Sequence, residues 1–178
     1  MNQGIHAIEL LTAALGRPAE VFAYAGCLAH QRIEVEDVAA AAVRFESGAL
    51  ATILGTTAAF PGVSTRLQVH GDRGSVVIEN DDLLFIHTTT GEQAEAFAGS
   101  QDSNNQLAQY GTASSSPTAT SDPRQLSDSH RHQYQNFLDA LDGKADLVVS
   151  LDEARLAVAL TLAIYESGRV GRPVAIRS

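Results

Sequence analysis

The opening stretch of the chain brings together side chains that could move a proton. Asn2, His6 and Glu9 follow one another at intervals of four and three residues, and on a helix this spacing places side chains on one face. An imidazole beside a carboxamide at a helix N-terminus can donate or accept a proton near neutral pH. The spacing therefore makes His6 a candidate for acid–base chemistry. The alternative is that His6 is an ordinary polar residue on a helix surface.

Other common catalytic motifs are missing from the sequence. It contains no Gly-x-Gly-x-x-Gly dinucleotide fingerprint, no Walker-type phosphate loop and no nucleophile elbow. The single cysteine, Cys27, falls in a predicted apolar strand, where a thiol is usually inert. His130 and His132 are only two residues apart, so a helix would direct them to different faces, whereas a transition metal needs three or four converging ligands. We therefore expect no metal site.

Composition predicts a globular protein with a sizeable core. Apolar residues make up 44% of the 178 residues, which excludes the disordered class. The net charge of −9 argues against nucleic acid and anionic membranes as partners. The sequence has one cysteine and no signal segment or membrane-spanning apolar run, so we expect a cytoplasmic protein.

The hydrophobic pattern predicts an α+β fold with an open, mainly antiparallel sheet. A helix is expected over residues 3–15, with Asn2 as its N-cap and Gly16 and Pro18 as its stop signal. Short apolar runs joined by tight turns follow, and turns this short allow only antiparallel neighbours. About six such strands are expected, over residues 21–28, 37–45, 49–57, 65–70, 75–79 and 83–87.

Two helices and a polar loop are expected in the second half of the chain. The segment from about 89 to 126 loses its hydrophobic period and is predicted to be mainly mobile, with a short ordered piece around Ala94 to Ala98. A helix should begin near Ser127 or Asp128 and stop at Gly143, and it is expected to bury Tyr134, Phe137, Leu138 and Leu141 at helical spacing. The last helix should follow a capping box at Ser150 and Glu153, and a short edge strand is expected over 173–176.

The second and third predicted strands carry small apolar residues on both faces. Val38, Ala40 and Ala42 point to one side, and Ala39, Ala41 and Val43 to the other, whereas a sheet with one wet face would alternate apolar with polar residues. We therefore expect helices on one face and a second subunit on the other. The alternatives are that a missing domain or the polar loop covers that face.

Five stretches, in this order, resemble a known family. The resemblance is carried by Asn2–Leu11, Glu36–Val38, Val43–Leu50, Val69–Val76 and the closing pair Tyr165–Gly168 and Gly171–Val174. Together they are similar to the C-terminal domain of Gfo/Idh/MocA-type oxidoreductases, the relatives of glucose-fructose oxidoreductase and inositol dehydrogenase. The resemblance covers nearly the whole chain except the polar loop.

This resemblance implies a division of labour between two domains. In the family, an N-terminal Rossmann domain binds NAD or NADP and supplies a lysine, while the C-terminal domain forms the substrate pocket and pairs subunits through its sheet. The family's acid-x-x-x-His motif falls on Asn2 and His6, which implies that His6 accepts or donates the proton of the substrate hydroxyl. Asn2 departs from the commoner aspartate and could orient substrate but not act as a base. Glu9 would have a structural or orienting role. His130 would lie near the pocket rim, or else be a solvated cap.

The resemblance leads to a functional expectation with one competitor. Residues 1–178 are expected to be a single substrate-binding and dimerisation domain of an NAD(P)-dependent oxidoreductase acting on a sugar, polyol or related hydroxy compound. The Rossmann domain is expected to be absent, so the chain alone should bind no cofactor and be inactive. The competitor is a free-standing, non-catalytic ligand-binding or dimerisation module with the same fold.

Overall fold

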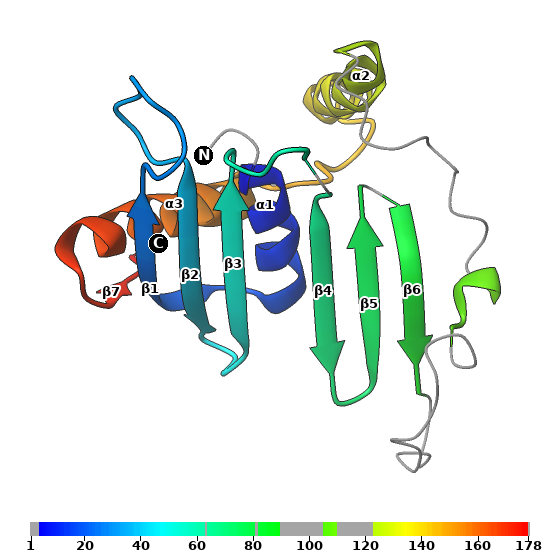
Figure 1. The fold of residues 1–178 in the computed structure, drawn as a ribbon. Helices are drawn as coiled ribbons and strands as arrows, with labels where there is room; N and C mark the ends of the chain where they lie inside the picture. The colour runs from blue at the N-terminus through cyan, green and yellow to red at the C-terminus, as the bar shows by residue number, and fades with distance from the viewer. Residues whose placement is uncertain (1–3, 63, 81, 90–104, 110–122, 178) are drawn as a thin grey trace. The chain divides into compact units, whose positions relative to one another are not determined.

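A computed structural model describes residues 4–62, 64–80, 82–89, 105–109 and 123–177 (Figure 1). The chain divides into two compact units, one formed by Met1–Val63 with Asp122–Ser178 and the other by Ser64–Ser121. The expected α+β class is confirmed, because the described helices accompany strands that pair only in antiparallel fashion. The strands form a four-stranded and a three-stranded sheet, whereas the sequence pattern indicated one.

The first unit is built on the four-stranded sheet, whose order is β3-β2-β1-β7. Its strands are β1 (Pro18–Gly26), β2 (Val38–Phe45), β3 (Leu50–Thr56) and β7 (Val174–Ala175). The hairpin between β2 and β3 turns at Gly48, which has a φ of 87° that a glycine adopts without steric cost. Strand β7 pairs with only two residues of β1, so most of that edge of β1 needs other partners.

Two helices lie behind this sheet as Figure 1 views it, α1 (Gly4–Leu15) and α3 (Leu151–Val170). Helix α3 packs against β1, and α1 packs against α3. The predicted capping box is confirmed, since the Ser150 side chain accepts from the Glu153 N–H and the Glu153 side chain accepts from the Ser150 N–H. Gly171 ends α3 in the left-handed conformation, with a φ of 65°. Local signals therefore define both ends of α3.

Ser167 joins α3 to β1 just beyond the two β1 residues that pair with β7. Its side chain is fully buried, and its hydroxyl accepts from the Ala23 N–H at 2.9 Å and donates to the Arg172 carbonyl at 2.8 Å. The next residue, Gly168, lies so close to β1 that an added Cβ would be 3.2 Å from the Cβ of Ala25. One serine thus satisfies an edge amide of β1 and a carbonyl just before β7.

The hydrophobic core of the first unit lies between the sheet and α3. The buried side chains come from one face of β1 and β2, from α3 and from one side of α1: Ile8, Leu11, Val21, Ala23, Ala41, Val43, Phe45, Leu156, Ala157, Leu160, Ala163 and Ile164. The opposite face of the same sheet is open in the described part of the chain. There Tyr24, Leu50 and Leu54 are 70%, 77% and 74% exposed.

The second unit is a three-stranded sheet of order β4-β5-β6, formed by β4 (Arg66–Gly71), β5 (Gly74–Glu79) and β6 (Asp82–Thr88). Part of the segment predicted to be a mobile loop lies along β6 and includes the short 3₁₀ helix η2 (Leu107–Gln109). The Asn105 side chain bonds the Ile86 N–H and the Leu84 carbonyl, and the Gln106 side chain bonds the N–H and carbonyl of Thr88. Two side-chain amides therefore pair with the β6 edge in place of another strand.

Helix α2 (Pro123–Leu141) begins about four residues before the predicted start. A proline at the first helical position is a start signal, which the sequence analysis did not use. The predicted stop at Gly143 is confirmed. Gly143 adopts a left-handed φ of 68°, and the N–H of the next residue, Lys144, bonds back to the Asp139 carbonyl. Helix α2 packs extensively on no other described helix or strand, so Tyr134 and Leu141 are about 70% exposed rather than buried as expected.

Other differences from the sequence analysis are confined to boundaries and to Cys27. Strand β1 starts at Pro18 and ends at Gly26, which leaves Cys27 outside the strand and exposed rather than packed in an apolar interior. The predicted ordered piece around Ala94 to Ala98 lies outside the described residues.

Replacing Ser167 by alanine tests the bridge between α3 and β1. S167A leaves a buried amide and a carbonyl without their partner, so the free energy of unfolding should fall by about 1–3 kcal/mol. Urea unfolding followed by circular dichroism measures this loss. The matched control is Ser47→Ala, which removes an exposed hydroxyl bonded to the Leu15 carbonyl and should change stability by less than about 0.5 kcal/mol. Equal effects of the two substitutions would contradict the bridge.

Candidate functional site

Helix α1 presents His6 to solvent because its other side is packed inward. Ile8, Leu11 and Thr12 are buried on the helix that packs against α3, and His6 lies on the remaining surface, where it is exposed. Its imidazole has no hydrogen bond or ion pair with any other described residue. A solvent-accessible imidazole can take up or release a proton near neutral pH.

The other three predicted site residues differ in how far the structure describes them. Glu9 is half-buried on the same helix, three residues after His6, and its carbonyl accepts from the Thr12 hydroxyl at 2.9 Å. No hydrogen bond joins the Glu9 and His6 side chains. Asn2 lies outside the described residues. His130 belongs to α2, which makes no extensive contact with α1. The structure therefore places His6 and Glu9 on one helix but does not gather all four residues.

A second polar cluster surrounds the buried Asp37, which lies immediately before β2. Its carboxylate accepts from the backbone N–H groups of Leu28, Ala29 and His30 at 2.7–2.8 Å, and from the Nδ1 of His30 at 3.2 Å. The three backbone donors, and to a lesser degree the His30 side chain, hold the pKa of Asp37 well below its usual range. A carboxylate that accepts this many hydrogen bonds is a poor base. Because three of the donors are backbone groups of the β1–β2 loop, Asp37 instead anchors that loop.

The same loop is attached to α3 by a tyrosine. The Tyr165 hydroxyl donates to Glu36 Oε1 at 2.6 Å. Burial, together with the hydrogen bond and the negative charge of Glu36, raises the pKa of Tyr165 to about 12. The phenol therefore stays protonated near neutral pH and acts as a hydrogen-bond donor rather than a base.

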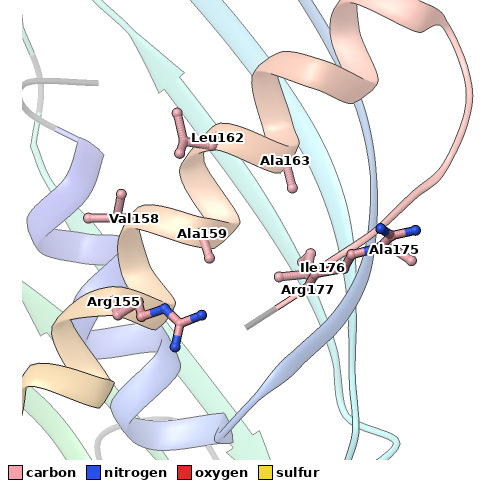
Figure 2. Close-up of a pocket in the computed structure, with 8 residues that line it drawn as sticks. All are labelled: Arg155, Val158, Ala159, Leu162, Ala163, Ala175, Ile176 and Arg177. Carbon is pink, nitrogen blue, oxygen red and sulfur yellow. The ribbon is translucent and has the colours of Figure 1, made fainter.

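The first unit also has a hollow of about 460 Å³ between α3 and the C-terminal tail (Figure 2). It is lined by Arg155, Val158, Ala159, Leu162 and Ala163 of α3 and by Ala175, Ile176 and Arg177. None of these residues belongs to α1, so the hollow is separate from His6. The sequence analysis did not identify it, although Arg155, Val158 and Leu162 recur at the spacing of one helix face.

The described residues were compared with the ligand sets of metal sites and with the sheets that bind dinucleotides. They include no group of three or more His, Cys, Asp or Glu side chains that could hold a metal ion. Their strands pair only in antiparallel fashion, whereas dinucleotides bind at the carboxyl ends of parallel strands beside a glycine-rich turn. Among the same residues, no helix combines the length and apolar character needed to span a membrane.

Comparison with known proteins identifies one family and a set of similar folds. The family model described as "Oxidoreductase family, C-terminal alpha/beta domain", that of the Gfo/Idh/MocA proteins, matches residues 1–176. No functionally curated protein sequence matches the chain.

Among solved structures, the WlbA dehydrogenase from Bordetella pertussis, in complex with NADH and UDP-GlcNAcA, is 23% identical with a TM-score of 0.71, over 100% of this chain and 46% of that one. An oxidoreductase from Agrobacterium radiobacter, in complex with NAD⁺, L-tartaric acid and magnesium, is 22% identical with a TM-score of 0.66, over 97% of this chain and 47% of that one. Levoglucosan dehydrogenase, in complex with NADH, is 16% identical with a TM-score of 0.69, over 99% of this chain and 50% of that one. The chain therefore shares their fold and spans about half the length of each.

The Asp37 cluster makes a prediction about acid stability. Because the pKa of Asp37 is lower in the folded chain than its unfolded value of about 3.9, its contribution to stability is complete above that value and is lost as the pH falls further. D37N removes the titrating group, so the variant should be less stable than the wild type at pH 7 and the difference should shrink toward acid pH. Thermal unfolding from neutral to acid pH measures both. Asp72→Asn, on the β4–β5 turn, is the control. If the stability difference between D37N and the wild type did not change with pH, the lowered pKa of Asp37 would be contradicted.

Proposed function

Because this chain belongs to the family of Gfo/Idh/MocA oxidoreductase C-terminal domains, we propose that it is the substrate-binding and oligomerisation domain of an NAD(P)-dependent oxidoreductase. The substrate would be a sugar, a polyol or a related hydroxy compound. The family match over residues 1–176 carries this proposal. Two proteins of similar fold support the substrate class, since one is a dehydrogenase solved with NADH and UDP-GlcNAcA and another is levoglucosan dehydrogenase.

The proposal assigns the nicotinamide cofactor to a part of a longer protein that this chain does not include. Two observations support this division. The chain spans about half the length of the proteins whose fold it shares, and its sequence has no dinucleotide fingerprint. The chain alone would therefore be inactive. We place the protein in the cytoplasm, in keeping with its single, exposed cysteine.

We assign His6 the role of acid or base toward the substrate hydroxyl. When a hydroxyl carbon loses hydride to NAD(P), the oxygen must lose its proton, and an imidazole is suited to accept it near neutral pH. His6 is exposed and has no described partner that would occupy its nitrogens. Asn2 and Glu9 would orient substrate near it, and His130 would lie at the rim of the pocket. The Asn2 carboxamide can bond a hydroxyl but cannot take its proton.

The open face of the four-stranded sheet is the proposed oligomerisation surface. Phe22 of β1 lies opposite Ala42 of β2, and Tyr24 lies opposite Ala40, which in turn lies opposite Leu54 of β3. The small residues of β2 leave a flat apolar centre between larger side chains on both neighbouring strands. Apolar surface of this kind is stabilised by burial against a second subunit. A second copy of the sheet is the proposed partner.

Substitution of His6 tests the proposed chemistry. In the protein that also carries the dinucleotide-binding half, H6A should lower kcat about 10²–10⁴-fold, the usual contribution of a general acid or base. NADH formation measured over a range of pH values should also lose the ionisation due to the imidazole. The control is His70→Ala, which changes an exposed histidine in β4 whose imidazole bonds the Ser75 hydroxyl. A kcat within twofold of the wild type would exclude His6 as the acid or base.

Substitution of Leu54 tests the open sheet face. The chain should be a dimer at micromolar concentration, and L54K should shift it to monomer because a charge within an apolar contact is costly to bury. Sedimentation velocity measures both states. Leu10→Lys, which changes an exposed leucine on α1, should leave the dimer intact. A monomeric wild type, or dissociation by both substitutions, would contradict this surface.

A further inference from the structure

Leu28 extends the open face of the four-stranded sheet beyond the end of β1. Ala25 faces α3, because a Cβ added to Gly168 of α3 would lie 3.2 Å from the Ala25 Cβ. Successive residues of a strand face opposite sides, so Gly26 faces the open side. A Cβ added to Gly26 would lie 3.5 Å from Cδ2 of Leu28. The Leu28 side chain therefore lies over Gly26 on the open face, where Leu28 is 81% exposed.

The carboxylate of Asp37 holds Leu28 in this position. The Leu28 N–H donates to Asp37 Oδ1 at 2.8 Å, and the next two N–H groups of the loop donate to Oδ2. The Asp37 side chain is fully buried, and the Asp37 N–H bonds the Gly26 carbonyl at 3.0 Å. The loop thus presents an exposed leucine from a backbone that is already fixed, which reduces the entropy lost when a partner covers it.

The open face combines protruding side chains with a shallow centre. Tyr24 and Leu28 are exposed on the β1 side, and Leu54 is exposed on β3. Between them, β2 offers only the methyl groups of Ala40 and Ala42 to this side. In a two-fold dimer the same patch faces itself, so the patch must hold both protruding and receding parts. This face holds both.

The charge of the face also suits a second copy of the chain. The net charge of −9 makes two copies repel each other unless they meet at a neutral surface. Strands β1, β2 and β3 contain one acidic residue, Glu20, and one basic residue, Arg44, and these pair with each other at 3.2 Å. A like-charged copy can therefore approach this face without a local charge opposing it.

We propose that Leu28 is an anchor of the contact between two copies of this chain and that Asp37 is its positioning residue. This inference rests on the proposed oligomerisation surface and adds the β1–β2 loop to it. In the dimer, Leu28 of each copy is buried against the open sheet face of the other. The gain is obtained twice, because a two-fold contact uses the same residue from both copies.

Truncation of Leu28 tests the anchor, with sedimentation equilibrium to measure the Kd of the dimer. L28A should raise this Kd by at least about tenfold, because each dimer loses two buried leucine side chains. Leu28 is 81% exposed, so L28A should keep the circular dichroism spectrum of the wild type. The matched control is Leu162→Ala, which truncates a 55% exposed leucine of α3, on the other side of the sheet. It should change the Kd by less than about twofold.

A double-mutant cycle tests the positioning role of Asp37. D37N should raise the dimer Kd about threefold to tenfold in the wild-type background, because the loop that presents Leu28 loses its charged acceptor. In the L28A background the same substitution should leave the Kd unchanged, because no leucine is left to position. A general loss of stability would instead weaken both dimers alike, and equal effects of D37N in the two backgrounds would overturn the role of Asp37.

The outcomes separate this inference from the proposed surface itself. A wild-type chain that stays monomeric would contradict both. If the wild type is a dimer that L54K dissociates, the surface stands, and an L28A Kd within about twofold of the wild-type value overturns the role of Leu28 alone. An L162A effect as large as that of L28A would overturn it as well.

Discussion

The close packing of α3 on β1 is the constraint on which the first unit depends. Ser167 bridges an amide of β1 and a carbonyl ahead of β7, while Gly168 lets the helix backbone approach Ala25. Because α1 packs on α3 rather than on the sheet, the position of His6 is set through this contact. The hollow lined by Arg155 and Arg177 depends on the same contact, since it lies between α3 and the tail that follows β7.

Electrostatics in this unit separate anchoring groups from groups that remain chemically available. Asp37 and Tyr165 both have pKa values moved away from neutrality, and both attach the β1–β2 loop. His6 has no described partner and is exposed. A group that is already fully hydrogen-bonded has little hydrogen-bonding capacity left for a substrate, whereas an exposed imidazole with no partner among the described residues can offer it both ring nitrogens. This contrast supports the proposed acid–base role of His6 over such a role for Asp37.

Local signals in the sequence were enough to predict most elements of the fold, because they act over a few residues. The capping box at Ser150 and the glycine stop at Gly143 are examples. Contacts between distant segments could not be predicted in this way. The connection between β3 and β4 is nine residues long, includes Pro61 and Gly62 and is too long for a tight hairpin. The sequence does not show whether strands joined by such a connection pair with each other, so the division into two sheets was not predicted. The main donors to Asp37 are backbone N–H groups, and residue types do not show which backbone groups will meet a carboxylate.

The central claim is that this chain provides the substrate side of an oxidoreductase and that the dinucleotide is bound elsewhere in a longer protein. Titration of the isolated chain with NADH and NADPH, followed by the fluorescence of the reduced nicotinamide, tests it most directly. We expect no saturable binding of either dinucleotide to the chain, and binding once the dinucleotide-binding half is present. Saturable binding to the 178 residues alone would contradict it, because a nicotinamide site would then exist in a chain without the dinucleotide fingerprint.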